Sequence, residues 1–112
     1  MPRVIEISSR VIEMNDAGFM VNRDVWNEQV AEALAALVEI ELTDAHWEII
    51  LFIRNYYQQF NHLPNARLFT KAIRKEFGEH KGNTRYLYGL FPEGPLKFAC
   101  MIGGLPKPTS CI

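Results

Sequence analysis

The amino-acid sequence predicts an α+β fold that is mainly α: a small N-terminal β-hairpin or meander, about five helices, and a flexible C-terminal arm. Three observations lead to this prediction. β-Branched residues are concentrated before residue 15, and capping residues with helically spaced apolar residues recur between 22 and 102. The stretch 105–112 contains two prolines and has no periodicity, which is typical of an extended, exposed segment.

The N-terminal part is predicted to form short strands joined by turns. The apolar residues of 4–7 precede the pair Ser8-Ser9, and a second apolar stretch follows at 11–14. A turn signal at 15–18, which contains Asn, Asp and Gly, separates this stretch from a third short strand at 19–21. We therefore expect a β-meander over residues 1–21.

Capping residues indicate where the helices begin. Asn22, Asp24 and Asn27 are three candidate N-caps for a first helix that runs to about residue 38. Thr43 and Asn83 can cap two later helices. The remaining predicted helices cover about 44–60, 65–77, 84–91 and 95–102. The helix over 44–60 confines its polar residues to an arc of roughly 140°, so we expect it to be the central, mostly buried helix.

The helix over 65–77 has one apolar stripe and one basic side. Its apolar residues are Phe69, Ile73 and Phe77. Its basic residues are Arg67, Lys71, Arg74 and Lys75. Together with the helix before it, this element has the form of a helix-turn-helix, so a nucleic-acid-binding regulator is one alternative function.

Length and composition indicate one domain that spans 1–112, with a helical body at 22–102 and a mobile, cysteine-bearing arm at 103–112. The chain is 48% hydrophobic and 22% charged, which excludes a disordered protein. Its net charge is −1, with −6 in residues 1–60 and +5 in residues 61–112. The start, Met1 to Val4, lacks the apolar stretch of a signal peptide, so we expect a cytoplasmic protein.

The cysteine pattern points to reactive thiols. Cys100 and Cys111 are too few for a disulfide scaffold, and no ligand spacing indicates a metal site. Cys111 is the second-last residue given, behind a proline-spaced stretch, and an exposed thiol at such a position is either incidental or reactive. Cys100 lies on the last predicted helix, where packing in the core is the plainer interpretation.

The predicted arm gives Cys111 reach. From Gly104 to Cys111 is seven residues, or roughly 23 Å when fully extended. Gly103 and Gly104 offer a hinge, and Pro106 and Pro108 stiffen the segment, which lowers the entropy lost when it enters a partner's cleft. The same hinge would let the arm fold back toward Cys100.

A reactive thiol has to be partly ionised, because the thiolate is the nucleophile. Basic residues that would favour the thiolate are Lys107 on the arm and Lys81, Arg85 and Lys97 on the body. A plain solvated basic face is an equally simple interpretation of these residues.

The C-terminal third resembles the DsrC/TusE family. The resemblance rests on Lys81-Gly82-Asn83, on 85–88, on Leu90-Phe91-Pro92 with Gly94-Pro95, and on 104–108 with the second-last Cys111. Weaker similarity lies in Leu42-Thr43, His46-Trp47 and Tyr56-Tyr57. The resemblance implies an orthogonal array of about five helices beneath the hairpin, and a sulfur-carrying protein substrate more than a stand-alone enzyme.

The resemblance also implies the roles of the two cysteines. The family's second-last cysteine carries sulfur as a persulfide, which assigns that role to Cys111. The presence of Cys100 favours the DsrC branch, in which both thiols hold an extra sulfur atom as a trisulfide or close as a disulfide. Implied partners are dissimilatory sulfite reductase, DsrEFH/TusBCD-like and TusA-like sulfurtransferases, and a DsrK-like heterodisulfide reductase subunit. Siroheme and iron–sulfur clusters would belong to those partners, with no cofactor bound to this chain.

Other functions remain open at this stage. One is a TusE-type relay for tRNA 2-thiouridine synthesis, and another is a structural subunit anchored by its arm. A paralogue with a divergent partner is a third, because Phe98, Met101 and Gly103 differ from the residues common in the family.

Overall fold

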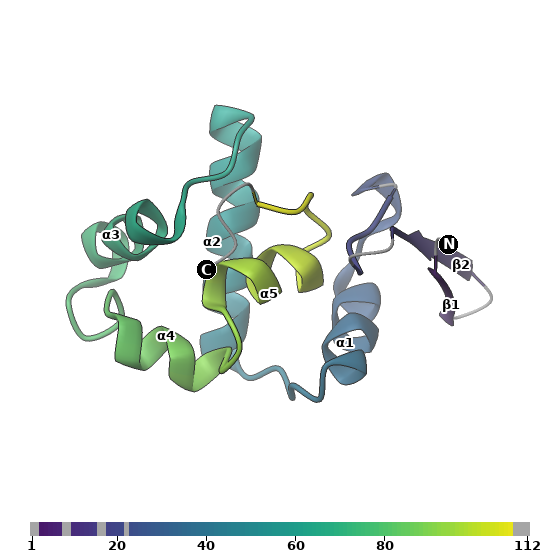
Figure 1. The fold of residues 1–112 in the computed structure, drawn as a ribbon, viewed down its shortest axis with the longest axis horizontal. Helices are drawn as coiled ribbons and strands as arrows, with labels where there is room; N and C mark the ends of the chain where they lie inside the picture. Colours follow the sequence, from purple (N-terminus) through teal and green to yellow (C-terminus); the bar gives the residue numbers. More distant parts are fainter. Residues whose placement is uncertain (1–2, 8–9, 16–17, 22, 109–112) are drawn as a thin grey trace.

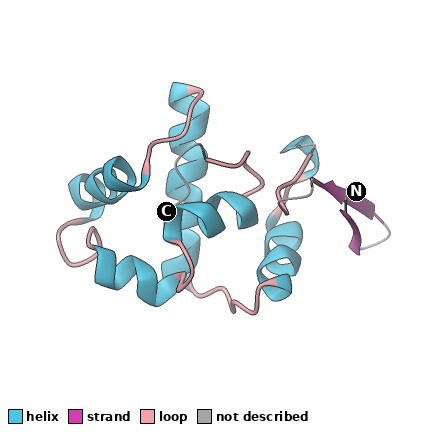
Figure 2. Cartoon of the chain, viewed as in Figure 1, coloured by secondary structure: helices cyan, strands magenta, loops and turns pink. Residues whose placement is uncertain are grey.

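A computed structural model describes residues 3–7, 10–15, 18–21 and 23–108. Figure 1 shows two strands at one edge of the molecule and five helices that make up the rest of the described chain. In chain order, the elements are β1 (Arg3–Ile7), β2 (Arg10–Met14), a short 3-10 turn (Arg23–Val25), α1 (Glu28–Leu37), α2 (Asp44–Phe60), α3 (Ala66–Phe77), α4 (Thr84–Leu90) and α5 (Pro95–Ile102). The mainly helical fold class predicted from the sequence is confirmed, and Figure 2 shows both strands on one side of the molecule.

The strands β1 and β2 form an antiparallel hairpin in which Arg3 pairs with Met14 and Ile7 pairs with Arg10. Along β2, Ile12 and Met14 are buried, whereas Val11 is 66% exposed, as the two-residue period of a strand requires. The third strand expected at 19–21 does not form as a strand. It is reduced to one bridge between Met14 and Met20 and a hydrogen bond from the Val21 amide to the Glu13 carbonyl, because the chain enters a 3-10 turn at Arg23.

Asparagine side chains cap three of the helices. The Oδ1 atom of Asn27 accepts from the Val30 amide at 2.9 Å, which selects Asn27 among the three candidates for the start of α1. Asn65 and Asn83 cap α3 and α4 in the same way, at 2.8 Å each. The caps at Asn27 and Asn83 agree with predicted helix starts, whereas Asn65, predicted as the first residue of its helix, is the N-cap before it.

The most buried helix is α5, and the prediction that α2 is the central buried helix is wrong in this respect. Seven of the eight α5 residues are buried, and α5 packs against α1, α2, α3 and α4. In α2, Ile49, Ile50 and Ile53 are buried, but Leu51 and Phe60 are about half exposed. The physical reason is length: α2 has 17 residues and extends beyond the core, whereas α5 is short and apolar at every position except Lys97.

The predicted two-sided character of α3 is confirmed. Phe69 and Ile73 are buried, and the ring of Phe77 packs against that of Phe52, with centroids 5.8 Å apart. The basic residues of α3 are exposed. In Figure 1, α3 and α4 lie on one side of α5, while α1 and the hairpin lie on the other.

Candidate functional site

Cys100 lies in the middle of the core. Its exposed fraction is 0%, and it belongs to α5, the helix that contacts the four other helices. The core packing expected of Cys100 is therefore confirmed. Cys111 lies among residues 109–112, outside the described part of the chain.

The C-terminal end of α5 is closed by a reversal of the chain at two glycines. Gly104 has a φ of +71°, in the left-handed region, and its amide donates to the Met101 carbonyl at 3.3 Å. The next amide, that of Leu105, donates to the carbonyl of Cys100 at 2.9 Å. This pair of hydrogen bonds is the Schellman motif, in which glycine is favoured because it has no Cβ atom. The reversal thus ties the backbone of Cys100 directly to the segment that leads to Cys111.

A tryptophan from the other end of the chain holds this reversal in place. The indole Nε1–H of Trp26 donates to the Ile102 carbonyl at 2.8 Å. The same ring lies so close to Gly104 that a Cβ atom there would be 2.5 Å from its Cδ1 atom. Trp26 therefore both satisfies a carbonyl at the end of α5 and occupies the space that a side chain at position 104 would need.

Arg54 of α2 completes the contact. Its guanidinium lies over the Trp26 ring, with Cζ 3.7 Å from the ring centroid, and it donates to the Gly103 carbonyl. Trp47 meets Trp26 edge-on, with centroids 6.5 Å apart. Trp26 and Arg54 thus contact each of the residues 102–104. We call these two side chains the Trp26–Arg54 clamp.

This clamp was not predicted from the sequence. Arg54 is one of the polar residues of the helix predicted over 44–60, and no sequence pattern indicated a role for Trp26. The available signal was an arginine on a helix rich in aromatic residues, together with a tryptophan just before a helix N-cap. Neither signal identifies its partner, because Trp26 and Ile102 are 76 residues apart in the chain.

The predicted arm begins later than the sequence suggested. The prediction that the segment is exposed from its start is wrong for most of its described part: Gly103, Gly104, Leu105 and Pro108 are buried, Pro106 is half-buried, and Lys107 is exposed. The physical reason is that the clamp and the Schellman motif turn the chain back onto the body, where Leu105 adds to the apolar core. The rest of the predicted arm, residues 109–112, lies outside the described part of the chain.

The three basic residues of the body that were predicted to face a thiolate make different contacts. The ammonium of Lys81 donates to the Glu48 carboxylate at 2.7 Å, and this hydrogen bond and charge raise the pKa of Lys81 above its ordinary value. The Nζ atom of Lys97 lies 5.5 Å from the ring centroid of Phe98, and Arg85 is exposed. Cys111, whose thiolate these residues are predicted to favour, lies outside the described residues, so that part of the prediction stays a prediction.

The motif Lys81-Gly82-Asn83 has a structural explanation. Lys81 joins its loop to α2 through Glu48, and Asn83 caps α4. Between them, Gly82 lies against the α3 backbone so closely that a Cβ atom would be 2.2 Å from Cα of Arg74. The Nε atom of Arg74 in turn donates to the Gly82 carbonyl at 2.9 Å. The motif therefore holds the loop between α3 and α4 in place through contacts with α2, α3 and α4.

His46 also has a structural role. It is 8% exposed; its Nδ1 accepts from the Thr43 amide at 3.1 Å, and its Nε2 lies 2.8 Å from the Leu90 carbonyl. With Nδ1 as acceptor, the neutral tautomer that carries its hydrogen on Nε2 satisfies both contacts. The ring thus connects the start of α2 to the end of α4.

Within the described part of the chain, no group of three or more His, Cys, Asp and Glu side chains is placed to hold a metal ion. No helix there is long and apolar enough to span a bilayer.

Curated relatives and solved structures resemble the chain over nearly its full length. The sulfurtransferase TusE homolog of Haemophilus influenzae is 46% identical over 109 residues, covering 97% of this chain and 100% of the relative. Sulfurtransferase TusE of Photorhabdus laumondii is 52% identical over 101 residues, covering 90% of this chain and 91% of the relative.

Solved structures agree with the fold described above. The solution structure of Allochromatium vinosum DsrC superposes with a TM-score of 0.91 at 43% identity, and covers 100% of both chains. The oxidised gamma subunit of dissimilatory sulfite reductase (DsrC) from Archaeoglobus fulgidus gives a TM-score of 0.83 at 39% identity, and covers 98% of this chain and 100% of that one. A family model described as DsrC like protein matches residues 6–112, and the chain therefore belongs to the DsrC-like family.

Proposed function

We propose that this protein is a sulfur-relay carrier that binds sulfur as a persulfide on Cys111. The observation that carries the proposal is the place of that cysteine in the chain: it follows Leu105, the last residue of the Schellman motif, by six residues. Six residues span roughly 20 Å when extended, which is enough to enter the cleft of a partner while the body stays outside. The names of the relatives, which are sulfurtransferases or DsrC proteins, support the same role.

Sulfur transfer to Cys111 needs no net oxidation or reduction. The Cys111 thiolate attacks the outer sulfur of a donor persulfide, so that a new S–S bond forms on Cys111. The S–S bond of the donor breaks, and its electron pair leaves with the donor's thiolate, which takes up the proton lost by Cys111. Transfer to the next acceptor repeats these steps in the other direction.

In this proposal Cys100 is the second, resolving thiol. Its thiolate attacks the Cys111 sulfur of the persulfide, a Cys100–Cys111 disulfide forms, and the outer sulfur leaves as hydrosulfide. A trisulfide that bridges the two cysteines is two electrons more oxidised than a persulfide beside a free thiol, so it would form only with sulfite as the oxidant, on a sulfite reductase. Two electrons and two protons, supplied by a heterodisulfide-reductase-like partner, would then release the bridging sulfur as hydrogen sulfide and leave the disulfide. Because Cys100 is fully buried, either step requires the end of α5 to open or Cys111 to enter the core.

Two branches of the family suggest different partners. As a DsrC-type protein, the chain would act as co-substrate of a dissimilatory sulfite reductase, with DsrEFH-like and TusA-like sulfurtransferases as donors and a DsrK-like subunit as reductant. Siroheme and iron–sulfur clusters would then belong to those partners. As a TusE-type protein, it would pass sulfur from TusBCD-like proteins toward tRNA 2-thiouridine. The curated relatives named TusE favour this second branch, and the presence of Cys100 favours the first.

The relay role is tested by following radioactive sulfur through the protein. A sulfurtransferase loaded with labelled persulfide is mixed with the reduced chain, which is then separated and given to an acceptor. We expect label on the wild type and on Cys100→Ala, but none on Cys111→Ala. Label that never reaches the chain from TusBCD-like or TusA-like donors would contradict the proposal.

The branch is tested in a bacterium that lacks its own TusE. Restoration of 2-thiouridine in tRNA by the wild type and by Cys100→Ala would assign the TusE-type relay. Formation of the Cys100–Cys111 disulfide during turnover with sulfite reductase, without such restoration, would assign the DsrC-type role.

A further inference from the structure

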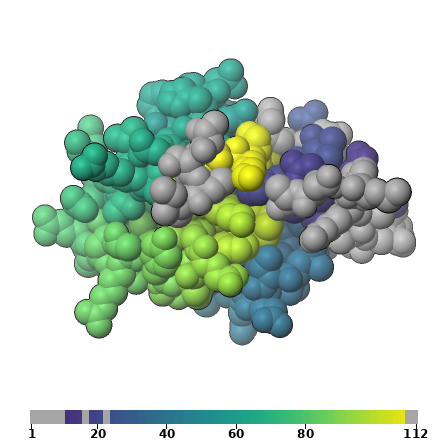
Figure 3. Space-filling view, viewed as in Figure 1, coloured from purple at the N-terminus to yellow at the C-terminus, as the bar shows by residue number. Residues whose placement is uncertain are grey.

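One feature that the sulfur chemistry does not use is a cleft between α3, α4 and the start of α5. It has a volume of about 490 Å³, within the usual range of ligand-binding clefts. None of its lining residues belongs to the Trp26–Arg54 clamp, so it is a separate surface. Figure 3 shows α3 and α4 next to each other at one end of the molecule.

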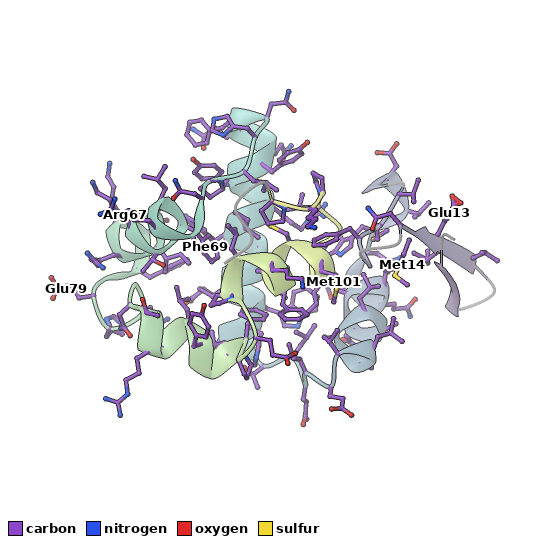
Figure 4. The ribbon with its side chains drawn as sticks, in the orientation of Figure 1. Glu13, Met14, Arg67, Phe69, Glu79 and Met101 are labelled. Atoms are coloured by element: carbon purple, nitrogen blue, oxygen red, sulfur yellow. The ribbon has the colours of Figure 1, made fainter. Side chains whose placement is uncertain are left out.

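The floor of this cleft is apolar and its rim is basic. Phe69, Leu87 and Leu96 line it from three different helices and are almost fully buried. Figure 4 shows Phe69 on the side of α3 that faces the body and Arg67 on the outer side. The basic rim residues, all exposed and all from α3, are Arg67, Lys71 and Arg74.

Two features make this rim a site for negative charge. Among the residues that the structure gives as lining the cleft, none is acidic, so no carboxylate of the lining neutralises the three cations. The guanidinium of Arg74 is also held in place, because its Nε atom donates to the Gly82 carbonyl at 2.9 Å. A side chain that is already positioned loses less entropy when it binds a ligand.

We propose that this cleft is a docking site for an acidic segment of a partner protein that inserts one apolar side chain. The apolar floor would bury the anchoring side chain, and the basic rim would pair with carboxylates on either side of it. The anchor supplies the affinity and the charges select the partner and raise the rate of encounter. The proposal goes beyond the sulfur-carrier role and does not depend on it.

The observations favour a protein segment over nucleic acid. A recognition helix that enters the major groove is convex and presents its side chains outward, whereas the cations here surround a concave, apolar surface. The net charge of −1 gives no overall attraction to a phosphate backbone.

The test selects binding peptides from a random library displayed on phage, using the complete chain as bait. We expect enrichment of sequences in which Asp or Glu flank a Leu, Phe or Trp. One selected peptide is then synthesised and titrated against matched variants. Lys71→Ser removes a cation that lines the cleft. Lys75→Ser is the matched control, because it removes a cation that lies on the same helix but outside the cleft.

We expect Lys71→Ser to weaken peptide binding about fivefold, and Arg67→Ser with Lys71→Ser to weaken it about tenfold or more. Lys75→Ser should leave the affinity unchanged, and NMR signals of Leu87 and Leu96 should shift on binding. Enrichment without acidic residues, or equal effects of Lys71→Ser and Lys75→Ser, would overturn the proposal. Binding of duplex DNA in physiological salt through Arg67, Lys71 and Arg74 would also overturn the proposal. Because the readout involves no sulfur, failure here is distinct from failure of the relay proposal.

Discussion

The indole ring of Trp26 occupies the space beside Gly104, where a Cβ atom would lie 2.5 Å from its Cδ1 atom. This contact joins a residue before α1 to the reversal that follows α5. It fixes the point from which the C-terminal segment departs, and so limits the length of chain that can carry Cys111 to a partner. The relationship also explains why position 104 needs glycine for two independent reasons, its left-handed backbone and its lack of a side chain.

The first prediction is that Gly104→Ala destabilises the protein by about 3 kcal/mol, through the cost of a left-handed alanine and the collision with Trp26. Urea unfolding followed by circular dichroism gives the free energy of unfolding. Displacement of Trp26 from the Ile102 carbonyl should also change the tryptophan fluorescence. An unchanged unfolding midpoint would show that the glycine at the chain reversal does not contribute to the stability of the fold.

The second prediction concerns Gly82, which touches the backbone of Arg74. Gly82→Ala should destabilise the protein by about 3 kcal/mol, because a backbone cannot move aside as a flexible side chain can. The matched control is Gly89→Ala, since a Cβ atom at that position of α4 meets nothing within 4 Å. The control should stabilise the protein by about 0.5 kcal/mol, the ordinary benefit of alanine over glycine in a helix. If both variants shift the unfolding midpoint alike, the close contact of Gly82 is not what holds the loop.

The third prediction is that Cys100 reacts slowly in the folded protein. In the Cys111→Ser variant, alkylation of Cys100 by iodoacetamide should be on the order of a hundredfold slower than in urea, because the thiol is fully buried. Trp26→Ala should speed the folded-state reaction by loosening the end of α5. Gly89→Ala serves as the control, because it should leave the alkylation rate of Cys100 unchanged. Rapid alkylation of the folded Cys111→Ser variant would contradict the position assigned to Cys100.

The fourth prediction concerns the pair of Lys81 and Glu48. The hydrogen bond and charge of Glu48 raise the pKa of Lys81 above 10.5, so the folded protein holds this proton more tightly than the unfolded chain. The stabilising effect of the pair is therefore fully present below about pH 10 and is lost as the pH rises through the raised pKa.

NMR titration of the Lys81 side chain measures this pKa directly. Glu48→Gln should lower it toward its ordinary value, and Glu79→Gln, which removes a carboxylate elsewhere, should leave it unchanged. The stability difference between the wild type and Lys81→Met should also shrink above the raised pKa. A Lys81 pKa that stays the same in Glu48→Gln would rule out the pairing.

Features that depend on a few neighbouring residues were predictable from the sequence. The asparagine caps of α1, α3 and α4 act over three residues, and the apolar stripe of α3 repeats along one helix. The burial of α2 was overestimated for a related reason. Helical periodicity shows which face of a helix is apolar, but it does not show how far the helix extends beyond the rest of the core.

Features that depend on distant residues could not be predicted in this way. Trp26 and Ile102 are separated by 76 residues, and Arg54 and Gly103 by 49. Gly103 and Gly104 were correctly placed at the end of a helix, but two glycines in a row are equally typical of a hinge and of a helix cap. Only the packing of Trp26 distinguishes these alternatives, and it shows that Gly103 and Gly104 end a helix and are buried.

Mass spectrometry of the intact protein shows directly whether Cys111 carries sulfur as a persulfide. The reduced chain is incubated with a persulfide-loaded sulfurtransferase, weighed, and then cleaved to locate the added mass. We expect the wild type and Cys100→Ala to gain the mass of one sulfur atom, located in the peptide that contains Cys111. Cys111→Ala should gain none. A sulfur atom that still appears on Cys111→Ala would show that Cys111 is not the carrier.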